Sequence, residues 1–294
     1  MDLSSLPVIN QLSDHISIVQ KEALRIIRVR HPKASAAIAL HGAHVLSHIP
    51  EGQAEVIWMS DAAILDGSAA LRGGIPICWP WFGRIASPAH GFVRNREWSL
   101  LDYQDTPDNV TLTLGVNSDD NTLAIWPHQF ALRLVVTIAD TLDVRLEIEN
   151  TDTQPWMFSG ALHTYLNLGD VRQAKVTGMG SEYIDSLQDS QLCQGGETLS
   201  LEQGIDRVYT QPNARISVAD PELNRQIEVS NAGHNSAVLW NPWQEGAQAM
   251  VDMQNDGYLT MLCVESTQHA KSIEEGITLD PNQTYTLSTS LTCR

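Results

Sequence analysis

The stretch LDVRLEIE at residues 142–149 alternates strictly between apolar and polar side chains, so that its apolar residues share one face. A period of two residues is that of a β-strand, and a strand with one apolar face must pack that face against another layer. Two further stretches repeat the alternation, VTLTLGV at 110–116 and YTLSTSLT at 285–292. The half-buried strand is therefore the dominant element of the chain.

Shorter apolar stretches extend this pattern along the whole sequence. The shorter strand candidates are residues 15–19, 24–29, 36–40, 55–59, 133–138, 215–218, 226–229, 237–240 and 259–265. Turn-forming residues such as Asp256-Gly257 and Asp280-Pro281 separate them, and helical periodicity is weak, with short helical turns expected only within 183–192 and 268–275. We therefore expect an all-β, antiparallel sandwich or barrel with few short helices. Because neither a repeat nor a linker is evident, residues 1–294 are expected to form a single domain.

Composition excludes several classes of function. The 294 residues contain 18 lysines and arginines against 35 aspartates and glutamates, a net charge of −17, which disfavours binding to nucleic acid or to an anionic membrane surface. No apolar run reaches 18 residues, and the first twenty residues lack the features of a secretory signal. The four cysteines show no CxxC spacing, so we expect reduced thiols and a cytoplasmic protein.

An arginine-rich stretch is the first candidate for a functional site. LRGGIPICWPWFG at 71–83 fits neither the strand nor the helix period, and PAHGFVRNR follows at 88–96. No acidic residue occurs between Asp66 and Glu97, although this stretch holds four arginines: Arg72, Arg84, Arg94 and Arg96. Guanidinium groups bind phosphate or carboxylate in a bidentate manner, which favours an anion site. Pairing of these arginines with carboxylates from elsewhere explains the stretch equally well.

Three further stretches carry side chains suited to proton transfer or sugar binding. In ALHTYLNL at 161–168, an extended backbone places His163, Tyr165 and Asn167 on one face, and histidine suits proton transfer near neutral pH. Glu265 ends an apolar stretch, where burial would raise its pKa and make it a useful base. Asp206 is a possible acceptor for a ligand hydroxyl. A structural histidine, a solvent-exposed or arginine-paired glutamate and a turn aspartate are the alternatives.

Other patterns are weaker. Tryptophan rings stack on sugars, but most tryptophans in such a chain belong to the core; the candidates are Trp79, Trp81, Trp126, Trp240 and Trp243. The histidines His41, His44 and His48 lack a nearby thiol or carboxylate and do not predict a metal site. No phosphate-loop, dinucleotide or nucleophile-elbow motif occurs in a suitable context.

Taken together, the motifs resemble those of the hexose-6-phosphate mutarotases, within the aldose 1-epimerase (galactose mutarotase-like) superfamily. They are RGGIPICWPWFG, PAHGFVRN, ALHTYLNLGD, DRVY, WNP and CVES, in this order. The resemblance covers nearly the whole chain, from about Leu6 to the last strand. It implies an antiparallel β-supersandwich with an active-site groove across one sheet, and neither a metal nor a cofactor.

The resemblance also implies a role for each motif residue. His163 matches the general acid and Glu265 the general base. Arg72 and Arg94 match residues that hold the substrate and its phosphate, His90 matches a histidine that lines the pocket, and Asp206 matches a carboxylate that binds sugar hydroxyls. Some relatives carry glutamine where Ala89 stands. The implied partner is a hexose 6-phosphate, with no obligate protein partner.

The expected activity is therefore the interconversion of the α and β anomers of a hexose 6-phosphate, with glucose 6-phosphate as the first choice. In this hypothesis Glu265 takes a proton from O1 and His163 gives one to O5, from opposite sides of the ring. Three alternatives remain. They are a mutarotase for unphosphorylated aldoses, a non-catalytic sugar-phosphate-binding protein, and a glycoside hydrolase, which requires two carboxylates.

Overall fold

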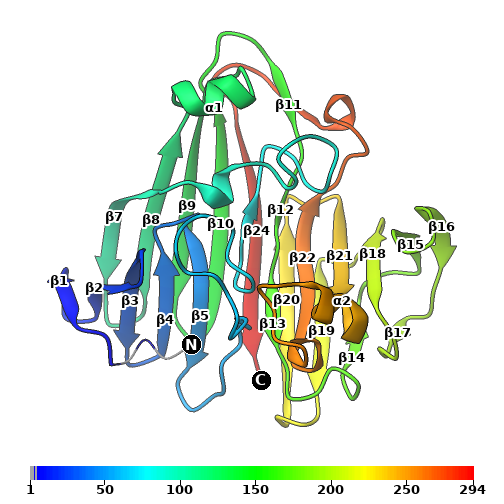
Figure 1. Cartoon of the computed structure of the whole chain (residues 1–294). Helices are drawn as coiled ribbons and strands as arrows, with labels where there is room; N and C mark the ends of the chain where they lie inside the picture. Colours follow the sequence, from blue (N-terminus) through cyan, green and yellow to red (C-terminus); the bar gives the residue numbers. More distant parts are fainter. Residues whose placement is uncertain (1–2, 4) are drawn as a thin grey trace.

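The computed structural model describes residue 3 and residues 5–294, and its regular secondary structure is mostly antiparallel β-sheet (Figure 1). The all-β, antiparallel fold class is confirmed. A single domain over residues 1–294 stays a prediction. Residues 1, 2 and 4 lie outside the described residues. They are also part of the first twenty residues, in which the sequence shows no features of a secretory signal.

The largest sheet has nine strands and contains all three strictly alternating stretches. Its order is β17 (Thr198–Leu199), β14 (Lys175–Thr177), β19 (Arg215–Asp220), β20 (Arg225–Ala232), β24 (Thr284–Cys293), β10 (Thr141–Asn150), β9 (Phe130–Ile138), β8 (Val110–Asn117) and β7 (Ser99–Asp105). Leu146 of β10 lies opposite Leu134 of β9 and Leu287 of β24, so the apolar faces of neighbouring strands are in register. This register makes one face of the sheet continuously apolar.

A second sheet of eight strands carries the site. Its order is β16 (Gln191–Gln194), β15 (Glu182–Asp185), β18 (Ile205–Tyr209), β21 (Ser236–Asn241), β22 (Met261–Gln268), β12 (Gly160–Leu162) and β6 (Ile77–Cys78), with β13 (Tyr165–Asn167) also paired to β22. Along β22, Leu262 and Val264 enter the main core, whereas Cys263 and Glu265 face the opposite side. The sheet therefore has one face in the core and one face available for chemistry.

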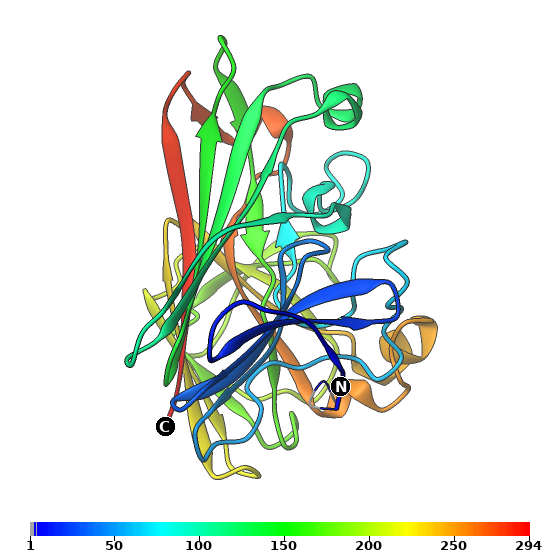
Figure 2. The same cartoon turned by 90° about the vertical axis from the view of Figure 1, so that its left-hand side faces the viewer.

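The remaining sheets are smaller. A five-stranded meander comprises β1 (Val8–Gln11), β2 (Ile16–Lys21), β3 (Leu24–His31), β4 (Ala34–Ala39) and β5 (His44–Pro50), and β11 (Trp156–Phe158) pairs with β23 (Ile277–Leu279). Seen from the side, β24 and its neighbours form one layer, and the other sheets lie on one side of it (Figure 2). A single large cluster of buried apolar side chains joins these layers.

Helices are few, and only one of the two predicted helical turns is observed. The described helices are α1 (Asp120–Ile125), α2 (Trp243–Ala249) and the short 3-10 turns Val93–Asn95, Gly257–Leu259 and Ile273–Glu275. The turn expected within 268–275 is confirmed, but 183–192 forms the hairpin of β15 and β16 instead. Residues 55–59 form no strand and contribute only isolated bridges, at Ile57 and Met59.

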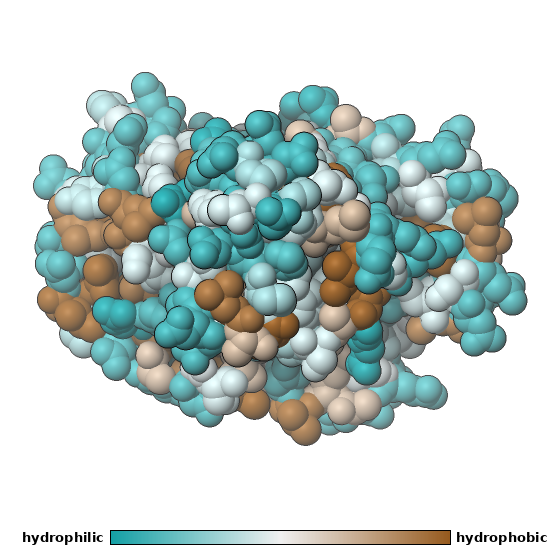
Figure 3. Space-filling view, turned by 90° about the horizontal axis from the view of Figure 1, so that it is seen from above, coloured by the Kyte–Doolittle hydropathy of each residue, from teal (hydrophilic) through white to brown (hydrophobic). Residues whose placement is uncertain are grey.

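The surface, the cysteines and the histidines near residue 44 can be compared with the expectations from the sequence. Seen from above, apolar residues form separate patches among polar ones (Figure 3). All four cysteines are free, as expected. His41, His44 and His48 each bond a backbone carbonyl, of Ala69, Gly73 and Ala139 respectively. Within the described chain, no helix has both the length and the apolarity needed to span a bilayer.

Candidate active site

A cavity of about 380 Å³ lies on the face of the eight-stranded sheet that points away from the main core. Its walls come from the sheet, from the arginine-rich stretch and from the end of α2. The lining includes all six side chains proposed from the sequence: Arg72, His90, Arg94, His163, Asp206 and Glu265. The structure thus brings together motifs that are separated by nearly 200 residues of sequence.

Strand alternation and register build the floor of this pocket. Cys263 of β22 lies between Tyr165 of β13 and Trp240 of β21, and Trp240 in turn lies opposite Asp206 of β18. All four residues are on the same face of the sheet, because directly paired residues share a face. Glu265, two residues beyond Cys263, points the same way.

His163 occupies the break between β12 and β13. Its backbone N–H donates to the carbonyl of Pro76 at 3.0 Å, and its ring stacks on that of Tyr165 with 4.8 Å between ring centres. The ring Nε2 lies 3.4 Å from Oε1 of Glu265. The side chains expected to act as acid and base are thus in contact with each other, and their placement on opposite sides of the sugar ring stays a prediction.

Burial perturbs both members of this pair. Only 11% of the His163 side chain and 1% of the Glu265 side chain are exposed. Burial, helped by the negative charge of Asp206, raises the pKa of Glu265 well above 4.5. Burial, with smaller contributions from the neighbouring basic groups His90, Arg94 and Arg72, lowers the pKa of His163 well below 6.5. The Oε2 atom of Glu265 and the Nδ1 atom of His163 have no partner in the described structure. The buried pair therefore favours its uncharged form, with its proton on the carboxyl group.

His90 is held as a neutral imidazole. Burial, followed by the charges of the pocket arginines, lowers its pKa to about 4. The backbone N–H of Gly83 donates to its Nδ1 atom at 3.3 Å. Because a neutral imidazole carries one proton, that proton is on Nε2. His90 is thus a hydrogen-bond donor to the pocket.

The four arginines of the acid-free stretch have different surroundings. Arg72 is bound to Asp252, with Nε 3.2 Å from Oδ1, and its Nη1 donates to the Tyr165 hydroxyl at 3.1 Å. Arg94 donates from Nη2 to the carbonyl of Ala89 at 2.9 Å, and its buried Nε has no partner. Arg96 lies outside the pocket.

Arg84 is the exposed member of the group. It lines the pocket, and among the residues that the structure describes it makes neither a hydrogen bond nor an ion pair. Arg96, in contrast, pairs with Asp119 and does not contribute to the lining. Three of the four arginines thus line the pocket, and two of the four, Arg72 and Arg96, form ion pairs with aspartates.

Asp206 is the second carboxylate of the pocket. It lines the cavity, and burial raises its pKa, with a smaller contribution from Asp185. No ion pair joins it to an arginine within the described chain. The pocket therefore has positive charge near His90 and carboxyl groups near the sheet floor.

Some expected contributors lie elsewhere. Asn167 lies outside this pocket and donates to the carbonyl of Glu55 at 3.1 Å. Trp79, Trp81 and Trp126 are core residues, whereas Trp240 lines the pocket. Sequence reasoning missed Asp252, which holds Arg72, and a lone acidic residue in a loop offers no signal for that role.

Known proteins are similar to this chain in both fold and sequence. A crystal structure titled "putative mutarotase (YeaD) from Salmonella typhimurium" superimposes with a TM-score of 0.91 at 35% identity, covering 98% of this chain and 97% of that chain. The family model for aldose 1-epimerase matches residues 25–292. The chain belongs to the aldose 1-epimerase family, as the resemblance implied.

Two curated relatives carry a more specific name than the family does. A protein of Salmonella typhimurium (strain LT2) named "putative glucose-6-phosphate 1-epimerase" is 40% identical over 89% of this chain and 89% of its own length. A protein of Escherichia coli (strain K12) with the same name is 38% identical, with the same two coverages.

Proposed function

We propose that this protein interconverts the α and β anomers of a hexose 6-phosphate, with glucose 6-phosphate as the first substrate to test. The observation that carries the proposal is the 3.4 Å contact between His163 Nε2 and Glu265 Oε1 in a pocket lined by three arginines. The family, the names of the relatives and the positive wall of the pocket support it.

The proposed reaction is a reversible opening of the sugar ring. Glu265 removes the proton from O1, His163 delivers a proton to O5, and the C1–O5 bond breaks to give the open-chain aldehyde. Rotation about C1–C2 followed by the reverse proton transfers closes the ring as the other anomer. Because O1 and O5 are both bonded to C1, an acid and a base that are neighbours suit this reaction better than groups on opposite sides.

Burial gives this mechanism a preferred protonation state. The reactive form is the charged pair, an imidazolium His163 beside an ionised Glu265, and ring opening converts it to a protonated Glu265 and a neutral His163. The pKa shifts of both groups favour that second form. Proton transfer in the opening step is therefore favourable for the pair, which must first reach its charged form from the uncharged resting form.

Recognition of the phosphate is assigned to the arginine wall. Arg72 and Arg94 are held in place by protein partners, so they contribute fixed charge. Arg84, which is exposed and has neither hydrogen bond nor ion pair in the described structure, retains its full capacity for a bidentate phosphate contact. His90 and Asp206 are proposed to bind sugar oxygens, as donor and acceptor respectively.

Anomer exchange measured by NMR tests the proposal. Purified protein is added to equilibrated glucose 6-phosphate and, separately, to glucose. Acceleration for the phosphorylated sugar alone supports both the chemistry and the phosphate wall. Acceleration of both sugars to the same degree supports the chemistry but points to a mutarotase of unphosphorylated aldoses. No acceleration by a folded protein that binds the sugar phosphate would leave a binding protein.

The role of Arg84 is tested by Arg84→Met, which keeps the aliphatic length and removes the charge. We expect kcat/KM for glucose 6-phosphate to fall by about 10–100-fold, as for the loss of one charge-assisted contact, while any activity on glucose is unchanged. Arg96→Met is the matched control, since Arg96 pairs with Asp119 outside the pocket. Equal losses in the two variants would refute a specific role for Arg84.

A further inference from the structure

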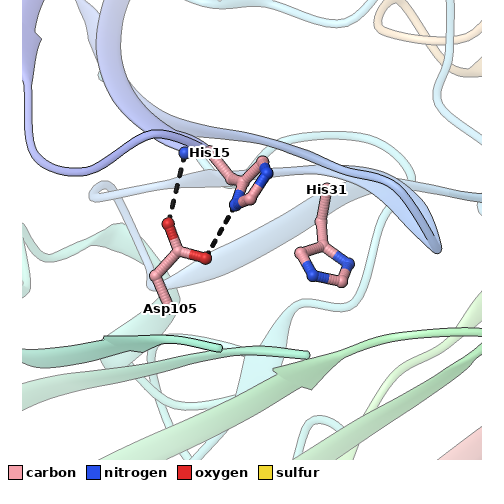
Figure 4. Close-up of side chains that lie close together, drawn as sticks. All are labelled: His15, His31 and Asp105. Carbon is pink, nitrogen blue, oxygen red and sulfur yellow. Dashed lines mark hydrogen bonds and ion pairs between the residues drawn. The ribbon is translucent and has the colours of Figure 1, made fainter. Parts of the chain in front are cut away.

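Two clusters of the described residues place three potential metal ligands within 4.8 Å of one another. The first contains His15, His31 and Asp105 (Figure 4), and its nitrogen and oxygen atoms are largely engaged. His15 Nδ1 donates to Asp105 at 2.8 Å, and His31 bonds the carbonyl of Thr106 and the N–H of Lys33. This cluster is explained as a hydrogen-bonded link between two sheets.

The second cluster differs because its potential ligand atoms make only one polar contact in the described structure. It consists of His163, Cys263 and Glu265, all buried on the pocket face of the eight-stranded sheet. Only the 3.4 Å contact from His163 to Glu265 joins them, and Glu265 Oε2 has no partner in the described structure. Tetrahedral zinc holds nitrogen, oxygen and sulfur ligands about 2.0–2.3 Å from the metal, which puts ligand atoms about 3–4 Å apart. Small side-chain movements bring the cluster to that geometry.

We propose that a thiophilic divalent cation, with Zn²⁺ as the type case, binds His163, Cys263 and Glu265 and thereby inhibits the enzyme. Binding replaces the thiol proton, which is released to water, by a metal–sulfur bond, and involves no change of oxidation state. The fourth position of the metal opens on the pocket. The inhibition arm of this inference rests on the proposed function, because it requires His163 and Glu265 to be the acid and base.

The surroundings of the cluster suit a metal ion that binds reversibly and inhibits, and they do not suit a permanently bound metal. A metal-binding histidine normally donates its second ring N–H to a fixed acceptor, and Nδ1 of His163 has no such partner in the described chain. Arg72 and Arg94 add positive charge nearby, which opposes the binding of a cation. Affinity should therefore be moderate and reversible by a chelator.

Cobalt spectroscopy tests binding without reference to catalysis. Co²⁺ added to the untagged full chain should give a thiolate-to-cobalt charge-transfer band that Zn²⁺ abolishes. Cys263→Ser should lose that band. Cys193→Ser should keep it, because Cys193 is a partly exposed thiol on β16, outside the cluster. A band that survives in Cys263→Ser, or is absent from the wild type, overturns the proposal.

Inhibition of anomer exchange provides the second readout. Zn²⁺ should inhibit the wild type, with recovery after addition of a chelator, whereas Mg²⁺ should not. Relative to its own rate without metal, Cys263→Ser should require at least tenfold more Zn²⁺ for half-inhibition than the wild type. Equal sensitivity of the two proteins contradicts the site. If neither protein accelerates anomer exchange, the proposed function fails, and the cobalt band still decides whether the metal site exists.

Discussion

Glu265 has one oxygen toward His163 and the other toward a pocket that leaves it without a partner. A buried carboxyl group that is not used by the fold is costly, since desolvation disfavours its charge and no hydrogen bond offsets the loss. Glu55, another largely buried glutamate, is in contrast engaged by the fold, because it accepts N–H bonds from His48 and Ile57. The contrast between the two glutamates is the clearest residue-level sign of function.

Glu265→Gln should abolish most of the catalysis and preserve substrate binding. Glutamine keeps the size of the side chain but cannot accept the O1 proton, so kcat should fall by about 10²–10⁴-fold, or roughly 3–5 kcal/mol of barrier. Exchange NMR measures the rate, and calorimetry with glucose 6-phosphate measures binding. Glu55→Gln, at a buried glutamate outside the pocket, is the control and should retain kcat. Loss of binding in a folded Glu265→Gln variant would rule out the role as base.

The pH profile follows from the directions of the two pKa shifts. Activity requires one proton on the pair, so it is lost when a second proton binds or when the only proton leaves. A second proton must enter on His163, whose pKa lies well below 6.5, and the last proton leaves from Glu265, whose pKa lies well above 4.5. The acid limb of kcat/KM should therefore fall below pH 6.5, with a broad plateau above it. An acid limb centred at or above pH 6.5 would contradict this assignment.

At the scale of elements, the RGG turn sets the position of Arg72. Gly74 has a φ of +71°, and a methyl group on its Cα would overlap the ring of His44 and the carbonyl of Val45. His44 in turn bonds the carbonyl of Gly73 at 2.7 Å. The turn is therefore locked against β5 on a path that admits only glycine.

Gly74→Ala should lower the free energy of unfolding by about 2–4 kcal/mol, because it combines the positive φ with a collision in the core. Gly52→Ala is the matched control: its φ of +72° is almost the same, but nothing lies within 4 Å of the added methyl group. The control should lose about 1–2 kcal/mol, from backbone strain alone. Urea denaturation measures both, and similar losses would show that the contact with β5 is unimportant.

Sequence reasoning at this scale succeeded for the alternating strands and failed where alternation does not govern packing. The predicted strands at 110–116, 142–149 and 285–292 are β8, β10 and β24, because each packs one face on the core. The hairpin at 183–192 lies at a sheet edge and is mostly exposed, so it lacks an apolar face that could reveal it. Residues 55–59 are apolar because they are buried, although they form only isolated bridges.

At the scale of the whole molecule, the net charge of −17 surrounds a pocket with a positive wall. Repulsion among surface carboxylates destabilises the compact state, and exposed ion pairs contribute little to offset it. The reversal to positive charge is therefore local to the pocket, where Arg72, Arg84 and Arg94 lie. Under the proposed function, these few arginines recognise the phosphate of the substrate.

Moderate salt should stabilise the folded protein. Raising NaCl from about 10 mM to about 300 mM shortens the Debye length from about 30 Å to below about 8 Å and screens the repulsion. We expect about 1 kcal/mol of added stability, or about 2–4 °C in Tm, measured by thermal unfolding. A neutral osmolyte at equal osmolality separates screening from solvent effects. A lower Tm in salt would mean that ion pairs such as Arg225 with Asp220 outweigh the repulsion.

The sequence by itself determined which face each regular strand presents and which residue types line the pocket. A period of two is a local property, so the alternation along β8 or β10 is readable without any tertiary contact. The motifs likewise identify Arg72, His163 and Glu265 as candidates, because glycine, proline and charged residues recur there in a distinctive order.

Only the tertiary structure decided how these groups meet. The contact between His163 and Glu265 depends on the pairing of β12 and β13 with β22, about a hundred residues further along the chain. The same long-range packing leaves Arg84 without an ion pair among the described residues and places Cys263 beside the acid and base. Strand order and register are set by the burial of whole faces against each other. Local periodicity does not indicate which strand will be the neighbour.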